Sequence, residues 1–221
     1  MKSVLVTGGT VRLGRAIAAR LRAEGWRVIT SSHRADAGAD IVADLSEPMG
    51  AAKLYAAALQ ILGGTPPDAL VNNAALFTGD DAAITAVNLE APKKLTMLMA
   101  GREVGVGAVV NILDAKADLP VSDKRRDAAS PLASGYLSSK RELGAFTLSA
   151  AATFAATLRV NGVAPGPVMA PTDVHEQAGE MLLDRRPTAD DVAAAVSFLL
   201  GAEATTGVII PVDAGQHLLE G

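Results

Sequence analysis

Two side chains that could carry out proton transfer, Tyr136 and Lys140, lie four positions apart in a segment whose composition predicts a helix over 134–156. Residues at this spacing share one face of a helix. A phenol has an ordinary pKa of about 10, and an ammonium group about 4 Å away would stabilise its anion by roughly 4 kcal/mol at an effective dielectric of about 20. That would bring the pKa toward about 7, where general acid–base catalysis is effective. The spacing alone is common on helices, so the prediction depends on the motifs around it.

A glycine-rich turn near the N-terminus has the form of a phosphate-binding loop. Residues 7–14 read TGGTVRLG and separate an expected strand at 4–6 from an expected helix at 13–24. Backbone N–H groups and the positive helix end face a pyrophosphate in such a turn. This context favours a dinucleotide site over a turn needed only for packing. The residues expected to contact the dinucleotide here are Gly8, Thr10, Arg12, Leu13 and Gly14.

The residues after the second expected strand, at 27–31, indicate which dinucleotide is bound. Sites for NAD usually place an Asp or Glu there to bond the ribose 2′-hydroxyl. This chain instead has His33 and Arg34, with Arg12 adding positive charge. A charge-assisted bond from Arg34 to a 2′-phosphate would contribute roughly 1.5–3 kcal/mol, or about 10- to 150-fold in preference. NADPH is therefore the expected cofactor, although an exposed polar turn would also explain the His-Arg pair.

The hydrophobic pattern predicts the elements that must position these residues. Short β-branched runs alternate with longer alanine-rich segments along all 221 residues. This order predicts one α/β domain over 1–221, a Rossmann-type doubly wound parallel sheet with helices on both faces. The expected strands lie at 4–6, 27–31, 41–43, 69–72, 108–113, 158–163 and 208–212. The expected helices lie at 13–24, 49–62, 84–102, 134–156 and 190–200.

Two irregular segments interrupt this order on the side where ligands are expected. Residues 122–130 form a polar insertion, and residues 167–186 have the character of a substrate flap. Each follows the carboxyl end of an expected strand, the edge at which open α/β sheets bind ligands. A solvated loop is the alternative interpretation of 122–130.

The composition excludes several other functional classes. A formal charge of −4 and the absence of cysteine argue against a nucleic-acid surface, disulfides and thiolate chemistry. The three histidines have no metal-ligand spacing, so no metal site is expected. The chain has neither a signal-peptide core nor a run of about 20 apolar residues that would span a membrane. We therefore expect a cytoplasmic protein that acts on a small molecule.

Taken together, these motifs resemble the short-chain dehydrogenase/reductase family over essentially the whole chain. Its markers occur in order at Thr7 to Gly14, Asp44-Leu45, Asn72 to Ala75, Asn88, Tyr136 to Lys140, Pro165-Gly166 and Val212 to Gly215. The resemblance implies cofactor contacts from Asp44, Leu45, Asn72, Ala74, Lys140, Asn161, Pro165 and Gly166. It also implies that Asn88 holds a water in a proton relay with Lys140. A homodimer or homotetramer, assembled through the helices near 84–102 and 134–156, is a further implication.

One departure from the family pattern concerns the substrate. Most members place a serine where this chain has Asp114, and an ionised aspartate cannot donate a hydrogen bond to a carbonyl. In this respect, and in Arg12, the His33-Arg34 pair and Phe77, the chain is similar to the pteridine reductase and dihydromonapterin reductase branch. That resemblance implies hydride transfer from NADPH to a C=N bond of a reduced pterin or similar heterocycle, with Phe77 stacking on the ring.

Two other functions remain open from the sequence. One is an NADPH-dependent carbonyl reductase acting on a ketone or an oxo-acyl chain, against which the missing serine argues. The other is a regulatory module that senses NADPH without catalysis, against which the set of Asn88, Tyr136 and Lys140 argues.

Overall fold

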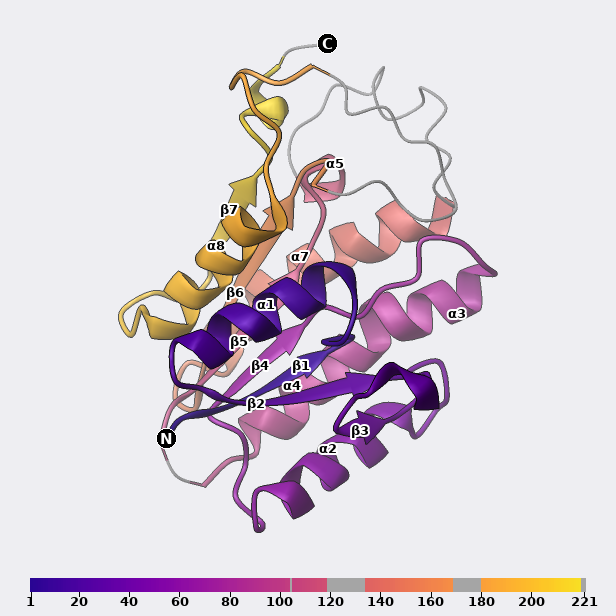
Figure 1. The fold of residues 1–221 in the computed structure, drawn as a ribbon, viewed down its shortest axis with the longest axis vertical. Helices are drawn as coiled ribbons and strands as arrows, with labels where there is room; N and C mark the ends of the chain where they lie inside the picture. Colours follow the sequence, from indigo (N-terminus) through magenta and orange to yellow (C-terminus); the bar gives the residue numbers. More distant parts are fainter. Residues whose placement is uncertain (104, 119–133, 169–179, 220–221) are drawn as a thin grey trace.

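A computed structural model describes residues 1–103, 105–118, 134–168 and 180–219 of the chain. Seven strands form one parallel sheet in the order β3-β2-β1-β4-β5-β6-β7 (Figure 1). Their bounds are β1 Ser3–Thr7, β2 Arg27–Ser32, β3 Ile41–Val42, β4 Ala69–Asn72, β5 Gly107–Ile112, β6 Leu158–Pro165 and β7 Ile209–Val212. The predicted doubly wound α/β fold is confirmed. The predicted insertion at 122–130 and residues 169–179 of the predicted flap lie outside the described residues.

Helices cover both faces of the sheet (Figure 1). One face packs against α1 (Arg12–Ala23) and α8 (Ala189–Gly201), and the other against α2 (Gly50–Ile61), α4 (Ala91–Ala100) and α7 (Ser134–Thr153). Shorter helical segments are η1 Ala35–Ala37, α3 Asp81–Thr85, η2 Ala86–Glu90, α5 Ala115–Asp118 and η3 Gln216–Leu218. Within the described ranges, no helix is long and apolar enough to cross a membrane.

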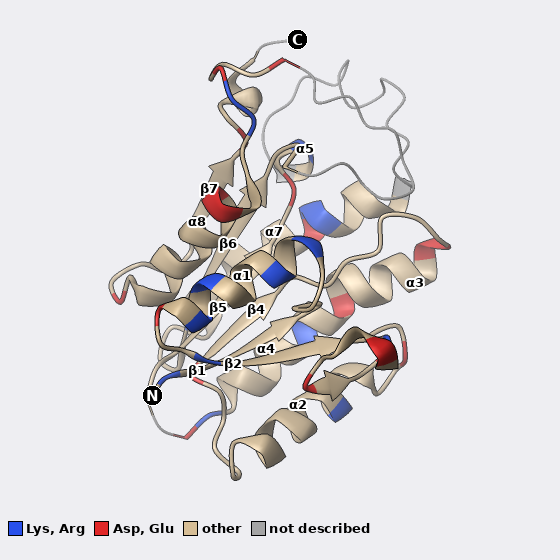
Figure 2. Ribbon diagram, in the orientation of Figure 1, with Lys and Arg blue, Asp and Glu red and all other residues tan. Residues whose placement is uncertain are grey.

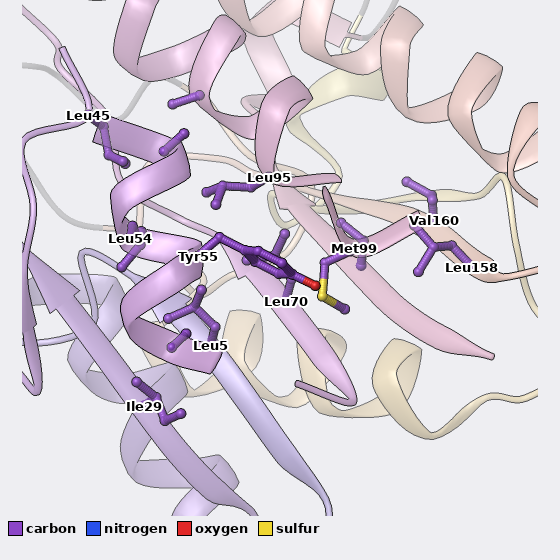
Figure 3. Packing of buried hydrophobic residues seen from close by; sticks show 14 of the residues in the cluster. Leu5, Ile29, Leu45, Leu54, Tyr55, Leu70, Leu95, Met99, Leu158 and Val160 are labelled. Carbon is purple, nitrogen blue, oxygen red and sulfur yellow. The ribbon is translucent and has the colours of Figure 1, made fainter. Parts of the chain in front are cut away.

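Side-chain alternation along the central strand divides the core into two layers. Val4 and Val6 belong to the layer beneath α1 and α8, whereas Leu5 belongs to the layer beneath α2 and α4. Figure 3 shows Leu5 and Leu70 in this second layer. All five residues of β1 are buried, because a parallel strand covered by helices on both faces has no solvated side.

One predicted helix differs from the structure. The segment expected to be helical over 84–102 consists of α3, a widened π-helical turn (η2) and α4. Pro92 lies four residues after Asn88 and has no N–H group, so it cannot complete the α-helical hydrogen bond to the Asn88 carbonyl. Such π-turns within helices are frequent at functional sites.

The strand order places the ligand crevice. From β1 the chain runs to β2 and β3 on one side, and from β4 to β7 on the other, so the order reverses between β1 and β4. In sheets of this type, ligands bind outside the carboxyl ends of the strands at this point. Thr7 ends β1 and Asn72 ends β4, which identifies the edge that the functional residues must share.

Candidate active site

The turn after β1 is packed so tightly that it requires glycine. Gly8 has a φ of +62°, in the left-handed region that favours glycine. A Cβ atom on Gly14 would lie 2.1 Å from the Gly8 carbonyl oxygen and 2.5 Å from Asn73 Nδ2. No side chain fits at position 14 without moving the backbone. The first turn of α1 is therefore held directly against the end of β1.

The N-terminus of α1 is built to receive an anion. Its N-cap residue, Val11, has no side-chain acceptor, and the first turn contains no acidic residue. Figure 2 shows α1 coloured only for basic charge, from Arg12, Arg15, Arg20 and Arg22. Among the described residues, the buried Thr10 Oγ1 has no hydrogen-bond partner. Uncapped N–H groups, a free hydroxyl and positive charge fit the pyrophosphate of a dinucleotide.

Arg12 adopts an unusual backbone conformation for a residue with a side chain. Its φ is +48°, which costs an L-residue roughly 1–2 kcal/mol relative to glycine. Backbone strain of this kind concentrates at ligand sites. Arg12 is the first residue of α1 and directly follows the glycine-rich turn.

Two residues of the predicted motifs that were not themselves assigned to the site, Thr7 and Asn73, join β1 to β4. Thr7 Oγ1 accepts hydrogen bonds from the backbone N–H groups of Asn73 at 2.9 Å and Ala74 at 3.0 Å. Asn73 Nδ2 donates to the carbonyl oxygens of Thr7 at 2.9 Å and Gly8 at 3.2 Å. These bonds hold the loops after β1 and β4 together at the switch point. The feature of the sequence that could have identified this contact is the pair of adjacent asparagines, Asn72 and Asn73. The prediction assigned only Asn72, and it assigned that residue to the cofactor.

Asn72 itself is enclosed at the end of β4. Its side chain is buried, and its Nδ2 donates to Asn111 Oδ1 at 2.8 Å. Ala74 and Leu13, also expected at the cofactor, are partly buried and pack against the core layers on opposite faces of the sheet.

The residues predicted for the adenosine end lie together beyond β2 and β3. Arg34 is exposed, and its Nε and Nη2 donate to Asp36 Oδ1 at 3.0 Å and Asp36 Oδ2 at 2.7 Å. Hydrogen bonds from Arg34 lower the pKa of the Asp36 carboxyl. His33 is exposed, and its electrostatic interaction with Asp36 contributes a smaller lowering of the same pKa. The guanidinium expected to bind a 2′-phosphate is thus already paired with a carboxylate.

Asp44 and Leu45 have different surroundings although they are adjacent. Asp44 is exposed, and its Oδ1 accepts from the backbone N–H and Oγ of Ser46 at 2.9 and 2.7 Å. These bonds lower the pKa of the Asp44 carboxyl. Leu45 is buried in the core layer shown in Figure 3. Asp44 is therefore accessible for adenine binding, whereas the Leu45 side chain mainly packs in the core.

The two residues expected to carry the chemistry lie on one face of α7 and are almost fully enclosed. Tyr136 is 3% exposed and Lys140 is 2% exposed. Lys140 Nζ donates to the Ile112 carbonyl oxygen at 2.8 Å and lies 5.9 Å from the centre of the Tyr136 ring. The helix spacing thus brings the ammonium group to the phenol, and β5 holds it in place.

The Asp114 carboxyl accepts a hydrogen bond directly from the phenol of Tyr136. Tyr136 Oη donates to Asp114 Oδ2 at 2.9 Å, and the Lys116 backbone N–H donates to Asp114 Oδ1 at 2.8 Å. Burial raises the pKa of the Asp114 carboxyl, although these hydrogen bonds and Lys140 oppose the increase. A carboxyl of this kind can hold a proton beside the phenol and deliver it to a substrate.

The Phe77 ring covers the Tyr136 ring. Their centroids are 5.1 Å apart and their planes differ by 28°, a stacked arrangement. Phe77 is only partly buried, so part of its ring remains accessible to solvent beside the enclosed Tyr136. The structure thus brings together Phe77 from the loop after β4, Asp114 from the segment after β5, and Tyr136 and Lys140 from α7.

Asn88 is buried, and both ends of its amide are bound. Its Oδ1 accepts from the Leu76 backbone N–H at 2.8 Å, and its Nδ2 donates to the Leu76 carbonyl oxygen at 2.9 Å and Ser139 Oγ at 3.2 Å. Ser139 Oγ in turn donates to the Tyr136 carbonyl oxygen at 2.7 Å. The amide therefore links the loop after β4 to α7.

Two of the three residues expected at the nicotinamide end, Pro165 and Gly166, lie at the carboxyl end of β6. Pro165 ends β6, and Gly166 packs so closely that a Cβ atom there would lie 2.6 Å from Asp213 Cβ. Asn161 does not frame this end, and that expectation is wrong. It pairs with Val110 in mid-sheet, and its Nδ2 donates to the Thr205 carbonyl oxygen at 3.0 Å. Its amide therefore supports the loop before β7.

No group of three or more histidine, aspartate or glutamate side chains in the described parts of the chain could hold a metal ion. The phenol of Tyr136, the carboxyl of Asp114 and the ammonium group of Lys140 lie together at this edge of the sheet.

Comparison with known proteins gives a consistent family match. A family model described as short chain dehydrogenase matches residues 2–182. L-xylulose reductase from Bos taurus is 30% identical over 97% of this chain and 96% of its own length. Pteridine reductase 1 from Leishmania tarentolae is 28% identical over 97% of this chain and 96% of its own length. The crystal structure of FolM alternative dihydrofolate reductase 1 from Brucella canis, complexed with NADP, has a TM-score of 0.81 and 30% identity, and the match covers 99% of this chain and 95% of that one.

Proposed function

The chain belongs to the short chain dehydrogenase family and is a nicotinamide-dependent oxidoreductase, and from this premise we propose that it uses NADPH to reduce a C=N bond of a reduced pterin or a similar heterocycle. The observation that carries the proposal is the hydrogen bond of 2.9 Å between Tyr136 Oη and Asp114 Oδ2. It supports a role for Asp114 as a second proton-holding group at the position where most of the family has a serine.

The carboxyl group suits a ring nitrogen better than a carbonyl oxygen. Reducing a C=N bond adds a hydride to carbon and a proton to nitrogen, and NADPH supplies the hydride when bound. Because burial raises the pKa of Asp114, its acid form persists to higher pH than that of an ordinary carboxyl. The protonated carboxyl can donate to the nitrogen, and Tyr136 can then return a proton to Asp114 through the bond that joins them.

Phe77 and Asn88 complete the assignment. The partly buried Phe77 ring lies against Tyr136 and offers a planar surface for a planar substrate. Both ends of the Asn88 side-chain amide are already hydrogen-bonded. We therefore assign the water of the proton relay to the backbone carbonyl oxygen of Asn88, to which Pro92 cannot donate a hydrogen bond. Lys140 would then connect that relay to Tyr136 and hold the ribose of the cofactor.

The proposal includes an assembly and a location. We propose a homodimer or homotetramer in the cytoplasm, formed through α4 and α7. Met97 on α4 and Leu148 on α7 each expose 48% of their surface, which leaves apolar area for such contacts.

The direct test is a substrate comparison. Purified protein is mixed with NADPH and either a 7,8-dihydropterin or a panel of ketones and oxo-acyl thioesters, and the loss of absorbance at the reduced nicotinamide band is followed. We expect kcat/KM for the dihydropterin to exceed that for every carbonyl substrate by at least about 10²-fold, as expected when a polar site matches one substrate and leaves groups unpaired with another. Turnover on ketones alone would contradict the pterin assignment while leaving the enzyme class unchanged.

Cofactor preference gives a second prediction, because Arg34 must exchange Asp36 for the 2′-phosphate. Replacing Arg34 with alanine should raise the Kd for NADPH by about 10- to 150-fold and that for NADH by less than about 3-fold. Replacing Asp36 with asparagine should act in the opposite direction and lower the Kd for NADPH, because it frees the guanidinium. Nicotinamide fluorescence titration measures both constants.

The matched control is Arg20→Ala on the last turn of α1, which removes a guanidinium that is also paired with a carboxylate, that of Glu24. This control should leave both Kd values within about 2-fold of those of the original protein, because salt screens an exposed charge that lies a Debye length or more from the 2′-phosphate. An equal loss of NADPH affinity in Arg20→Ala and Arg34→Ala would reject the assignment of Arg34.

A further inference from the structure

A line of three buried polar side chains joins the cofactor side of the sheet to the catalytic helix. Asn72 Nδ2 donates to Asn111 Oδ1 at 2.8 Å, and Asn111 Nδ2 donates to Thr147 Oγ1 at 2.8 Å. Thr147 Oγ1 then donates to the Leu143 carbonyl oxygen at 2.7 Å. The three side chains are at most 2% exposed. We propose that this polar ladder positions Tyr136 and Lys140 relative to the cofactor, and that Thr147 is its key residue.

The two ends of the ladder lie at functional places. Asn72 is the last residue of β4, directly before the loop whose Asn73 and Ala74 bind Thr7. Thr147 follows Lys140 by seven residues, about two helical turns, and therefore lies on the same face of α7. The ladder thus connects the loop beside the glycine turn with the helix that carries the phenol and the ammonium group.

The ladder gives α7 a second attachment to β5. Lys140 Nζ is bonded to the carbonyl oxygen of Ile112, and the Thr147 hydroxyl is bonded to the side chain of the preceding residue, Asn111. One attachment would leave the helix free to rotate about it, whereas two attachments two turns apart restrain both its rotation and its position along the strand. Hydrophobic packing alone is non-directional and restrains these movements less.

The bond pattern makes Thr147 hard to replace. Asn111 uses its acceptor for Asn72 and its donor for Thr147, so the Thr147 hydroxyl is the acceptor that Asn111 Nδ2 requires. A buried donor left without an acceptor is costly. Without the hydroxyl, either the Asn111 side chain must rotate or α7 must move. Either change would disturb the neighbouring hydrogen bond between Lys140 Nζ and the Ile112 carbonyl oxygen.

The inference rests on the proposed roles of Tyr136 and Lys140 and adds the means by which they are held. Misplacing reacting groups by about 1 Å can lower turnover by about 10²-fold, so a displacement of a few tenths of an ångström should produce a smaller but measurable loss. The expected signature is a lower kcat with little change in the KM of the substrate.

The chain provides a matched pair of threonines for the test. Thr147 and Thr96 are both fully buried in helices, but among the described residues Thr96 Oγ1 has no hydrogen-bond partner. The same substitution to valine therefore removes a ladder hydroxyl at one site and an unused hydroxyl at the other. Thr147→Ser keeps the hydroxyl and serves as the rescue variant.

We expect Thr147→Val to lower kcat by about 10-fold and to raise the Kd for NADPH, measured by nicotinamide fluorescence, by about 3-fold, with the substrate KM changed by less than 2-fold. Thr96→Val should change none of these values by more than about 2-fold, and Thr147→Ser should recover most of the loss. Assays are run well below the unfolding midpoint of each variant, which circular dichroism establishes.

Equal effects of the two valine substitutions, or no recovery in Thr147→Ser, would overturn the inference. A Tyr136→Phe variant assayed in parallel separates it from the proposed function. If Tyr136→Phe keeps its turnover, the assignment of Tyr136 fails; if it loses turnover while Thr147→Val does not, only the positioning ladder fails.

Discussion

Replacing Tyr136 with phenylalanine is expected to lower kcat by about 10²- to 10⁴-fold, the range that a positioned general acid contributes. The substitution removes one oxygen atom and with it the bond to Asp114 Oδ2. The ring itself remains, so the stack with Phe77 and the enclosure of Lys140 are kept. The Kd for NADPH should therefore stay within about 2-fold of its original value. Steady-state kinetics and nicotinamide fluorescence titration measure the two quantities independently.

The second tyrosine supplies the control. The chain contains two tyrosines, and Tyr55 is buried in the core layer between α2 and the sheet (Figure 3). Tyr55→Phe removes the same atom far from Asp114 and should leave turnover unchanged. Equal losses of turnover and of NADPH affinity in Tyr136→Phe would contradict a role in proton transfer, since they would indicate a collapsed site.

Replacing Asp114 with asparagine is expected to lower kcat/KM for a dihydropterin by about 10²-fold or more, because the amide cannot deliver a proton. The wild-type rate should depend on pH in a defined direction. Burial raises the pKa of the Asp114 carboxyl in the folded protein, so the acid form that donates the proton is lost only as pH rises through this raised value. The expected profile of kcat/KM against pH therefore falls toward high pH, and this fall should disappear in Asp114→Asn.

The same pKa shift has a consequence for stability. The folded protein binds the Asp114 proton more tightly than the unfolded chain does, so folding is favoured most below the unfolded pKa of about 3.9. This contribution is lost as pH rises through the folded pKa. The free energy of unfolding of Asp114→Asn should lack it, which urea titrations at several pH values can measure.

A third variant at this position, Asp114→Ser, distinguishes the two substrate classes. Serine can donate a hydrogen bond to a carbonyl, as in most of the family, but it cannot protonate a ring nitrogen. We expect this variant to lose dihydropterin turnover and to gain activity on ketones. A variant that keeps full dihydropterin activity would rule out proton delivery by Asp114.

Local sequence patterns were sufficient for the elements of the fold and for their order. The β-branched runs, the glycine turn and the four-residue spacing of Tyr136 and Lys140 each act over a few neighbouring residues, and the structure contains the corresponding elements. The break in the helix predicted over 84–102 also has a local cause in Pro92, but helical periodicity across the segment concealed it. Alternation and turn chemistry are local properties, and local properties can be recognised in a single sequence.

Only the tertiary structure decided how the side chains pair across the site. Asp114 bonds a phenol 22 residues away, Asn111 bonds a hydroxyl 36 residues away, and Asn73 bonds the carbonyl oxygen of a residue 66 positions earlier. Asn161 carries a polar amide near a functional motif, yet the strand register turns it toward Thr205.

The physical reason is that the sequence determines which groups can donate, accept or hold a proton, whereas partners are selected by the register of the strands and the rotation of the helices. Those two quantities follow from packing of the whole core. The sequence by itself therefore determined the α/β fold, the glycine turn after β1 and the Tyr136–Lys140 pair, and the tertiary structure decided that Asp114 shares a hydrogen bond with that phenol.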